Sequence, residues 1–118
     1  LELTINGDVI VTGETKNYYG LVVRYNNSGN VLWRSTDNHP SGFSNVNIDQ
    51  DGNLLISGYT ASGLVQGYVA KIDGGSGKFI GSYILDREPS QFFNAFSKNG
   101  FIYAAGDTLI KMIDFKSH

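Results

Sequence analysis

His39 and Asp37, two positions apart in the segment STDNHP, are the residues whose types best suit acid–base chemistry. An imidazole can act as a general base when a nearby carboxylate orients its ring. The alternative interpretation is a polar connection between two structural units, in which Pro40 stiffens the start of the following strand. We favour this structural interpretation.

The adjacent rings of Tyr18 and Tyr19, in the segment ETKNYYG, can stack on a sugar and are the best indication of a ligand in the sequence. We favour a packing role for one of them. If a ligand binds, we expect Tyr18 and Tyr19 to lie on the same side of the molecule as Asp37, His39 and Arg87. Arg87 belongs to the charged cluster DREP, whose neighbouring side chains point in different directions in an extended segment and do not converge.

Two further segments resemble ion-binding loops but lack essential parts. DQDGN, at 49–53, has the alternating acids of a calcium loop without the downstream glutamate, and its Asp-Gly pair is sufficient for a hairpin turn. GGSGK, at 74–78, connects two predicted strands, so no helix follows to bind a phosphate. His39 and His118 are the only histidines, which excludes a three-histidine site within this chain. We expect no metal and no cofactor.

The composition is that of one domain with a substantial core: 118 residues, 41% of them hydrophobic and 17% charged. A net charge of −2 gives no general attraction to nucleic acid or to acidic lipids. No apolar run of about 18 residues is present, so we expect no membrane insertion. The sequence starts at Leu1, has Met112 as its only methionine and shows no signal-peptide pattern. We expect a fragment or processed product of a longer chain.

A similar phrase occurs three times along the chain: GDVIVTGET at 7–15, DGNLLISGYT at 51–60 and NGFIYAAGDT at 99–108. The glycines that align, Gly13, Gly58 and Gly106, are spaced 45 and 48 residues apart. Flanking segments match in the same order, since LVVRYNNSGNVLW resembles YVAKIDGGSGKFI and FSNVNIDQDG resembles FFNAFSKNG. The sequence therefore predicts a repeated structural unit.

Each unit is predicted to hold four short strands, of which FSNVNID, LLISGY, YVAKI and KFIGSYI form the most complete set. LLISGY is apolar on both faces and must be covered on both sides. A repeat of about 40–50 residues with four antiparallel strands is typical of a β-propeller blade. A glycine in the second strand allows backbones to approach closely. We therefore expect Gly58 in a tight position between blades.

The phrases DGNLLISGYT, VVRYNNSGN and VLW resemble the SBBP-type β-propeller repeat. IDGGSGKFI is also similar to the turn of pyrroloquinoline-quinone-type propeller repeats, which often precedes an apolar strand and a tryptophan. Trp33 stands at that tryptophan position in the first unit, and Gly81 replaces it in the second. The resemblance implies a propeller fold and a secreted or cell-surface location, and it is compatible with many activities.

We predict an all-β fold that forms part of a β-propeller, with about 2.75 four-stranded antiparallel blades in a single segment, 1–118. Blade 1 spans about 1–37, blade 2 about 43–86, and a partial blade 3 about 92–116. So few blades leave apolar flanks and unpaired strand edges. We expect the fold to be completed by other blades of a longer propeller or by self-association.

In such a fold the connections that surround the channel lie on one face, and the tight turns lie on the opposite face. We expect the following connections on the channel face: 14–20, 35–42, 60–67 and 86–91. We expect the following turns on the opposite face: 26–29, 50–53 and 73–77.

The functional hypothesis is a non-catalytic scaffold or recognition module in an extracellular setting, with a protein or a glycan as its ligand. One alternative is part of a propeller enzyme (a lyase, hydrolase or quinone-dependent dehydrogenase) with its site at the channel mouth. No histidine, arginine or carboxylate recurs in register in all three units to favour it. The other alternative is a lectin. The triplet NNS makes Asn26 a glycosylation acceptor if the protein is secreted.

Overall fold

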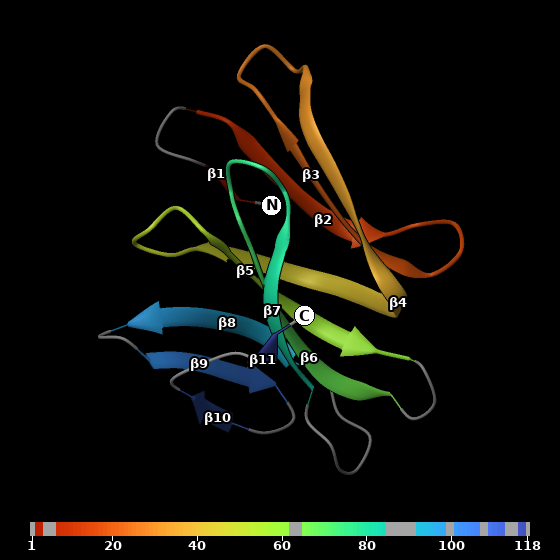
Figure 1. Cartoon of the computed structure of the whole chain (residues 1–118), viewed down its shortest axis with the longest axis vertical. Helices are drawn as coiled ribbons and strands as arrows, with labels where there is room; N and C mark the ends of the chain where they lie inside the picture. Colours follow the sequence, from red (N-terminus) through yellow and green to blue (C-terminus); the bar gives the residue numbers. More distant parts are fainter. Residues whose placement is uncertain are drawn as a thin grey trace.

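A computed structural model describes residues 2–3, 7–61, 65–84, 92–98, 101–106, 109–112 and 116–117 (Figure 1). The described residues form strands and turns without a helix, which confirms the predicted all-β class. The strands are β1 (Glu2–Leu3), β2 (Val9–Glu14), β3 (Tyr19–Tyr25), β4 (Val31–Ile48), β5 (Leu54–Thr60), β6 (Gln66–Ile72), β7 (Phe79–Ile84), β8 (Phe92–Lys98), β9 (Phe101–Gly106), β10 (Leu109–Met112) and β11 (Lys116–Ser117).

The strands form two antiparallel sheets. Eight strands pair in the order β1-β2-β3-β4-β5-β6-β7-β11, and three pair in the order β10-β9-β8. Apart from β11, the order follows the chain, so consecutive strands are joined as a meander. This is the arrangement that the density of turn residues predicted.

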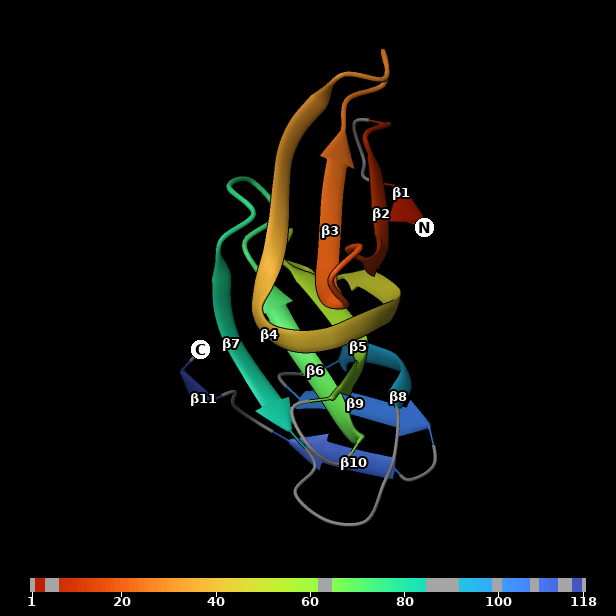
Figure 2. The same cartoon turned by 90° about the vertical axis from the view of Figure 1, so that its right-hand side faces the viewer.

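Strand β4 belongs to two layers of the fold. Its first part pairs with β3, ending at Tyr19 opposite Pro40, and its second part pairs with β5, beginning at Ser41 opposite Thr60. Figure 2 shows β4 bending across the molecule between these two neighbours. The predicted connection at 35–42 is therefore wrong, because these residues lie within β4.

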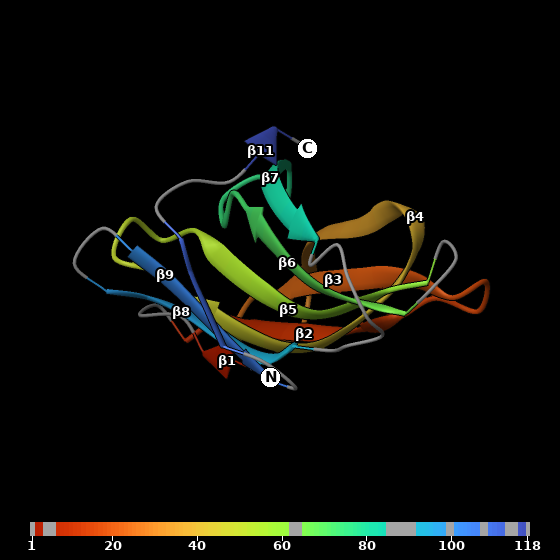
Figure 3. The same cartoon turned by 90° about the horizontal axis from the view of Figure 1, so that it is seen from below.

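We name three units from this pairing. Unit 1 consists of β1–β3 and the first part of β4 (31–40), unit 2 of the second part of β4 (41–48) and β5–β7, and unit 3 of β8–β10. Figures 1 and 3 show β5 and β6 between the strands of unit 1 and those of unit 3. Contacts of β8 with β4, β5 and β6 agree with this arrangement.

The core lies on the two faces of unit 2. The larger cluster joins Ile10 and Val22 of unit 1 to a set from unit 2: Phe43, Val46, Leu54, Ile56, Tyr68, Ala70 and Ile72. A smaller cluster joins Val69 of unit 2 to Ala95 and Ala104 of unit 3. Every residue of β5 from Leu54 to Gly58 is buried, so this strand is covered on both sides as predicted.

The pairing register recurs from unit to unit. Phe43 pairs with Gly58, and a register shift follows before Asn45; Phe92 pairs with Gly106, and a shift follows before Asn94. The sequence repeat thus corresponds to a repeated pattern of strand pairing and bulges.

The outer hairpins share a second irregularity. A register shift separates Arg24 from Tyr25 in unit 1 and Lys71 from Ile72 in unit 2. Trp33 stands opposite Arg24 and Gly81 opposite Lys71, so Gly81 occupies the tryptophan position as the sequence alignment predicted.

Candidate functional site

Four of the five predicted site residues lie at one end of the units. Tyr19 pairs with Pro40, next to His39, and the Ser41 amide donates a 3.0 Å hydrogen bond to the carbonyl of Tyr18. Arg87 lies outside the described residues. The turns at 26–29, 50–53 and 73–77 follow the far ends of β3, β4 and β6, away from the Tyr19–Pro40 and Ser41–Thr60 pairs, as expected for the four described residues. Whether the four residues bind a ligand stays a prediction.

Asp37, His39 and Ser41 alternate along β4 and meet at the seam between units 1 and 2. The Ser41 hydroxyl donates a 2.9 Å hydrogen bond to Asp37 Oδ2 and accepts one of 3.0 Å from the Gly20 amide. His39 Nε2 lies 3.6 Å from the same carboxylate oxygen, and His39 Nδ1 lies 3.3 Å from the hydroxyl of Thr60. The Asp37 side chain is fully buried.

The order of these groups does not suit nucleophilic catalysis. A serine nucleophile needs the base beside its hydroxyl and the acid behind the base. Here Asp37 stands between Ser41 and His39, and the Ser41 proton points to the carboxylate. Because the same hydroxyl also binds the Gly20 amide, the cluster fixes the bend of β4 against β3.

Tyr68 lies beneath this cluster and was not recognised as a site residue from the sequence. Its ring is fully buried, contacts His39 edge-on with centroids 5.1 Å apart, and stacks on Phe43. Burial, followed by the charge of Asp37, raises the pKa of the Tyr68 phenol far above its usual range. The hydroxyl lies near Asp37 and Ser82, but neither contact reaches the geometry of a good hydrogen bond. The phenol therefore stays protonated.

A second polar cluster joins units 1 and 2 at the opposite end. Arg24 pairs with Asp8 at 2.7 Å and donates a 2.6 Å hydrogen bond to the carbonyl of Gly74, which also accepts a 2.9 Å bond from the Trp33 indole. Both charged side chains are largely buried. The turn that contains Gly74 is thus held against unit 1, which gives the predicted tryptophan position a structural role.

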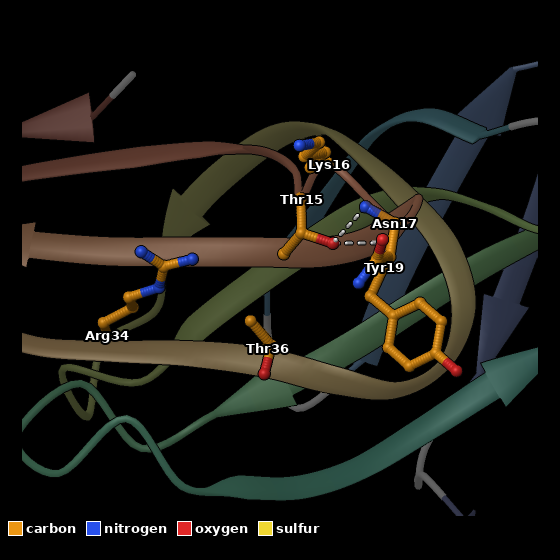
Figure 4. A pocket seen from close by; sticks show the side chains of 6 residues that line it. All are labelled: Thr15, Lys16, Asn17, Tyr19, Arg34 and Thr36. Atoms are coloured by element: carbon orange, nitrogen blue, oxygen red, sulfur yellow. Dashed lines mark hydrogen bonds between the residues drawn. The ribbon is translucent and has the colours of Figure 1, made fainter.

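An open hollow of about 680 Å³ lies beside the turn between β2 and β3 (Figure 4). Its lining comes from that turn and from β4, and consists of Thr15, Lys16, Asn17, Tyr19, Arg34 and Thr36. Of these, only Tyr19 was predicted as a site residue. The available signal was the alternation of Arg34 and Thr36, which places both on one face of a strand.

The turn that borders the hollow is held by its own hydrogen bonds. The Thr15 hydroxyl oxygen accepts bonds from the amides of Asn17 (3.3 Å) and Tyr19 (3.1 Å). The Thr15 amide donates to the Tyr19 carbonyl at 2.7 Å, and the Tyr18 amide donates to the Thr15 carbonyl at 2.9 Å. Tyr18 has a φ of 66°, which is unusual for a bulky residue, and the residue is 70% exposed.

A smaller hollow of about 110 Å³ lies where β4 crosses from unit 1 to unit 2. It is bordered by Glu14 and Tyr59. Burial, and then the neighbouring Glu14 carboxylate, raises the pKa of Tyr59. This hollow is too narrow for more than a few water molecules.

Among the described residues, no group of three or more histidine or acidic side chains converges as a metal site would require. Within the same ranges there is no helix of the length and apolarity needed to cross a membrane. No model of a known protein family matches the sequence, and no curated protein matches it. The resemblance to SBBP-type and quinone-type repeats therefore stays a prediction.

Proposed function

We propose that this chain is a non-catalytic recognition module, part of a β-propeller in an extracellular setting, that contacts a protein or glycan ligand. The observation that carries this proposal is the turn between β2 and β3. It is fixed by four internal hydrogen bonds, and it presents Tyr18 and Tyr19 to solvent beside an open hollow. Rigid, exposed aromatic side chains lose little conformational freedom on binding.

The recurrence of strand register and bulges supports the propeller part of the proposal. The pairs Phe43–Gly58 and Phe92–Gly106 carry the same irregularity, and units 1, 2 and 3 follow one another through face-to-face contacts. Units 1 and 2 have four strands each and unit 3 has three described strands, and a propeller is built from four-stranded antiparallel units of this length.

The outer faces of the described units support completion by further blades or by a second copy. Val11 of unit 1 is 39% exposed, whereas Ile56, its counterpart in unit 2, is fully buried against unit 1. On unit 3, Phe96 is 44% exposed and stacks on Tyr103. Apolar side chains on both outer faces are expected if each face packs on another unit.

The arrangement of Asp37 between Ser41 and His39 supports a non-catalytic role over an enzyme of the lyase, hydrolase or quinone-dependent class. The exposed side chains of Tyr18 and Tyr19 also support the lectin alternative. A glycan screen distinguishes a lectin from a module that binds a protein.

The proposal is tested by screening the intact chain on a glycan array and on a panel of secreted proteins, with Tyr18→Ala and Tyr19→Ala as variants. We expect binding that falls in at least one variant while the melting temperature is unchanged. Tyr25→Ala, at the opposite end of β3, is the control. Binding that is lost equally in the control, or turnover of a substrate at a described residue, would contradict the proposal.

A further inference from the structure

We propose that the hollow beside the β2–β3 turn binds the carboxylate of an acidic sugar, that is, a uronic acid unit in a glycan. This inference rests on the proposed recognition function and adds the chemical class of the ligand. It rests on the six side chains that line the hollow in Figure 4, and on the charges, hydrogen-bond donors and aromatic ring that they provide for a ligand.

The charge of the hollow is positive and unbalanced. Lys16 and Arg34 both line it, and neither forms an ion pair with a described carboxylate. The acid nearest to Lys16 in sequence, Glu14, has its carboxylate beside Tyr59 instead, and the acid nearest to Arg34, Asp37, accepts a hydrogen bond from Ser41. Arg24 provides the contrast, because its charge is used within the fold by Asp8. Within the part of the chain that the structure describes, the two cations of the hollow therefore face no carboxylate.

The neutral polar groups add donors to this site. The oxygen of the Thr15 hydroxyl already accepts two backbone hydrogen bonds, so its remaining capacity is to donate its proton. Asn17 and Thr36, whose side chains also carry hydrogen-bond donors, line the hollow and are exposed residues. Donors and cations together select a ligand rich in acceptors, such as a carboxylate with neighbouring hydroxyls.

The aromatic ring of Tyr19 indicates that the carboxylate belongs to a sugar. Tyr19 is 37% exposed as a residue and lines the hollow, while its backbone is fixed by pairing with Pro40 and by the Thr15 hydroxyl. An aromatic face beside hydrogen-bond donors suits the apolar face of a pyranose ring. In Figure 4 the Tyr19 ring and the Arg34 guanidinium border the same hollow from different strands.

Titration of the full chain with a short galacturonate oligosaccharide, followed by NMR or calorimetry, tests the inference. The methyl ester of the same oligosaccharide is the matched control, because it keeps the sugar and loses the charge. We expect the acid to bind with a Kd on the order of 0.1–1 mM, and about tenfold more tightly than the ester. Binding of the acid should weaken as salt is raised.

Three variants connect the binding to the hollow. Arg34→Gln and Lys16→Gln should each weaken the acid about tenfold. Lys98→Gln removes the same charge in β8 of unit 3, away from unit 1 and its hollow, and should leave binding unchanged. Circular dichroism and the melting temperature check that each variant is folded.

The remaining outcomes distinguish failure of this inference from failure of the proposed recognition function. Equal binding of acid and ester would overturn the inference while leaving the recognition function in place. Absence of binding to both would also overturn the inference, and the recognition function would then depend on the array and protein panel. A glutamate-rich peptide that binds as tightly as the acid, with no effect of Tyr19→Ala, would exclude the sugar and favour an acidic protein partner.

Discussion

A Cβ atom built on Gly58 falls 2.0 Å from the carbonyl oxygen of Gly42. Gly42 lies in β4 just after its passage from unit 1 to unit 2, so the backbone of this crossing strand occupies the place of a side chain. Gly58 is tightly placed as predicted, but its close contact is with β4, the strand that pairs with it inside unit 2, and not with a neighbouring unit. Gly13, which aligns with Gly58, has nothing within 4 Å of its Cβ position.

Gly58→Ala is expected to destabilise the protein by about 3 kcal/mol, because a backbone carbonyl cannot move aside as a flexible side chain can. Gly13→Ala is the matched control and should change stability by less than about 1 kcal/mol, in the stabilising direction. Denaturant unfolding of the two variants measures the difference. Equal effects would mean that the crossing strand is placed wrongly.

Arg24→Gln should cost about 2–3 kcal/mol, because it removes the ion pair with the largely buried Asp8 and the hydrogen bond to the Gly74 carbonyl. The equivalent cation in unit 2, Lys71, lies 3.8 Å from Asp49 and is 25% exposed. Lys71→Gln should therefore cost less than about 1 kcal/mol. Urea unfolding of both variants provides the comparison, and similar losses would contradict the structural role given to Arg24.

Ser41→Ala should destabilise by about 2 kcal/mol, since the buried Gly20 amide loses its acceptor and Asp37 loses a donor. Ser28→Ala, in an exposed turn, should change stability by less than about 0.5 kcal/mol. An organophosphorus reagent for activated serines should not label Ser41. Labelling at this residue, found by mass spectrometry, would revive the catalytic interpretation of the cluster.

Tyr68 makes the protein sensitive to alkaline pH. Its pKa is raised in the folded state above the ordinary value of 10.0, so above that pH the unfolded chain loses the proton while the folded chain keeps it. Stability should therefore fall as the pH rises beyond about 10. In Tyr68→Phe this fall should be smaller, and at neutral pH the variant should be as stable as the parent because the hydroxyl lacks a good partner. Melting temperatures from pH 8 to 11 measure both effects.

The apolar residues on both faces of LLISGY were sufficient to predict β5 and its burial. A strand that carries apolar side chains on both faces is stable only when both faces are covered. Composition misled at 35–42, where all eight residues are polar, proline or glycine and suggested a loop. These side chains instead bind one another and the neighbouring strands, which allows an extended backbone to bend without leaving polar groups unpaired.

A spacing present in the sequence would have indicated the structural role of this segment. The pattern Asp-x-x-Pro-Ser-x-Phe-x-Asn occurs at 37–45 and again at 86–94, so it accompanies the change of unit and not a single site. The hollow could not be predicted in this way. Lys16 and Arg34 are far apart in sequence, and only the pairing of β2, β3 and β4 brings them to one place.

Because β4 is shared, the boundary between units 1 and 2 has no linker. A chain divided at Gly42 would leave the first part of β4 with unit 1 and the second part with unit 2, and would remove the continuous strand that joins the two units. The two units should therefore unfold in a single step, with amide protons on both parts of β4 exchanging at the same rate. A graft or deletion that respects the fold would have to begin and end at the tight turns, such as 26–29 and 73–77, so the transferable module is offset from the sequence repeat.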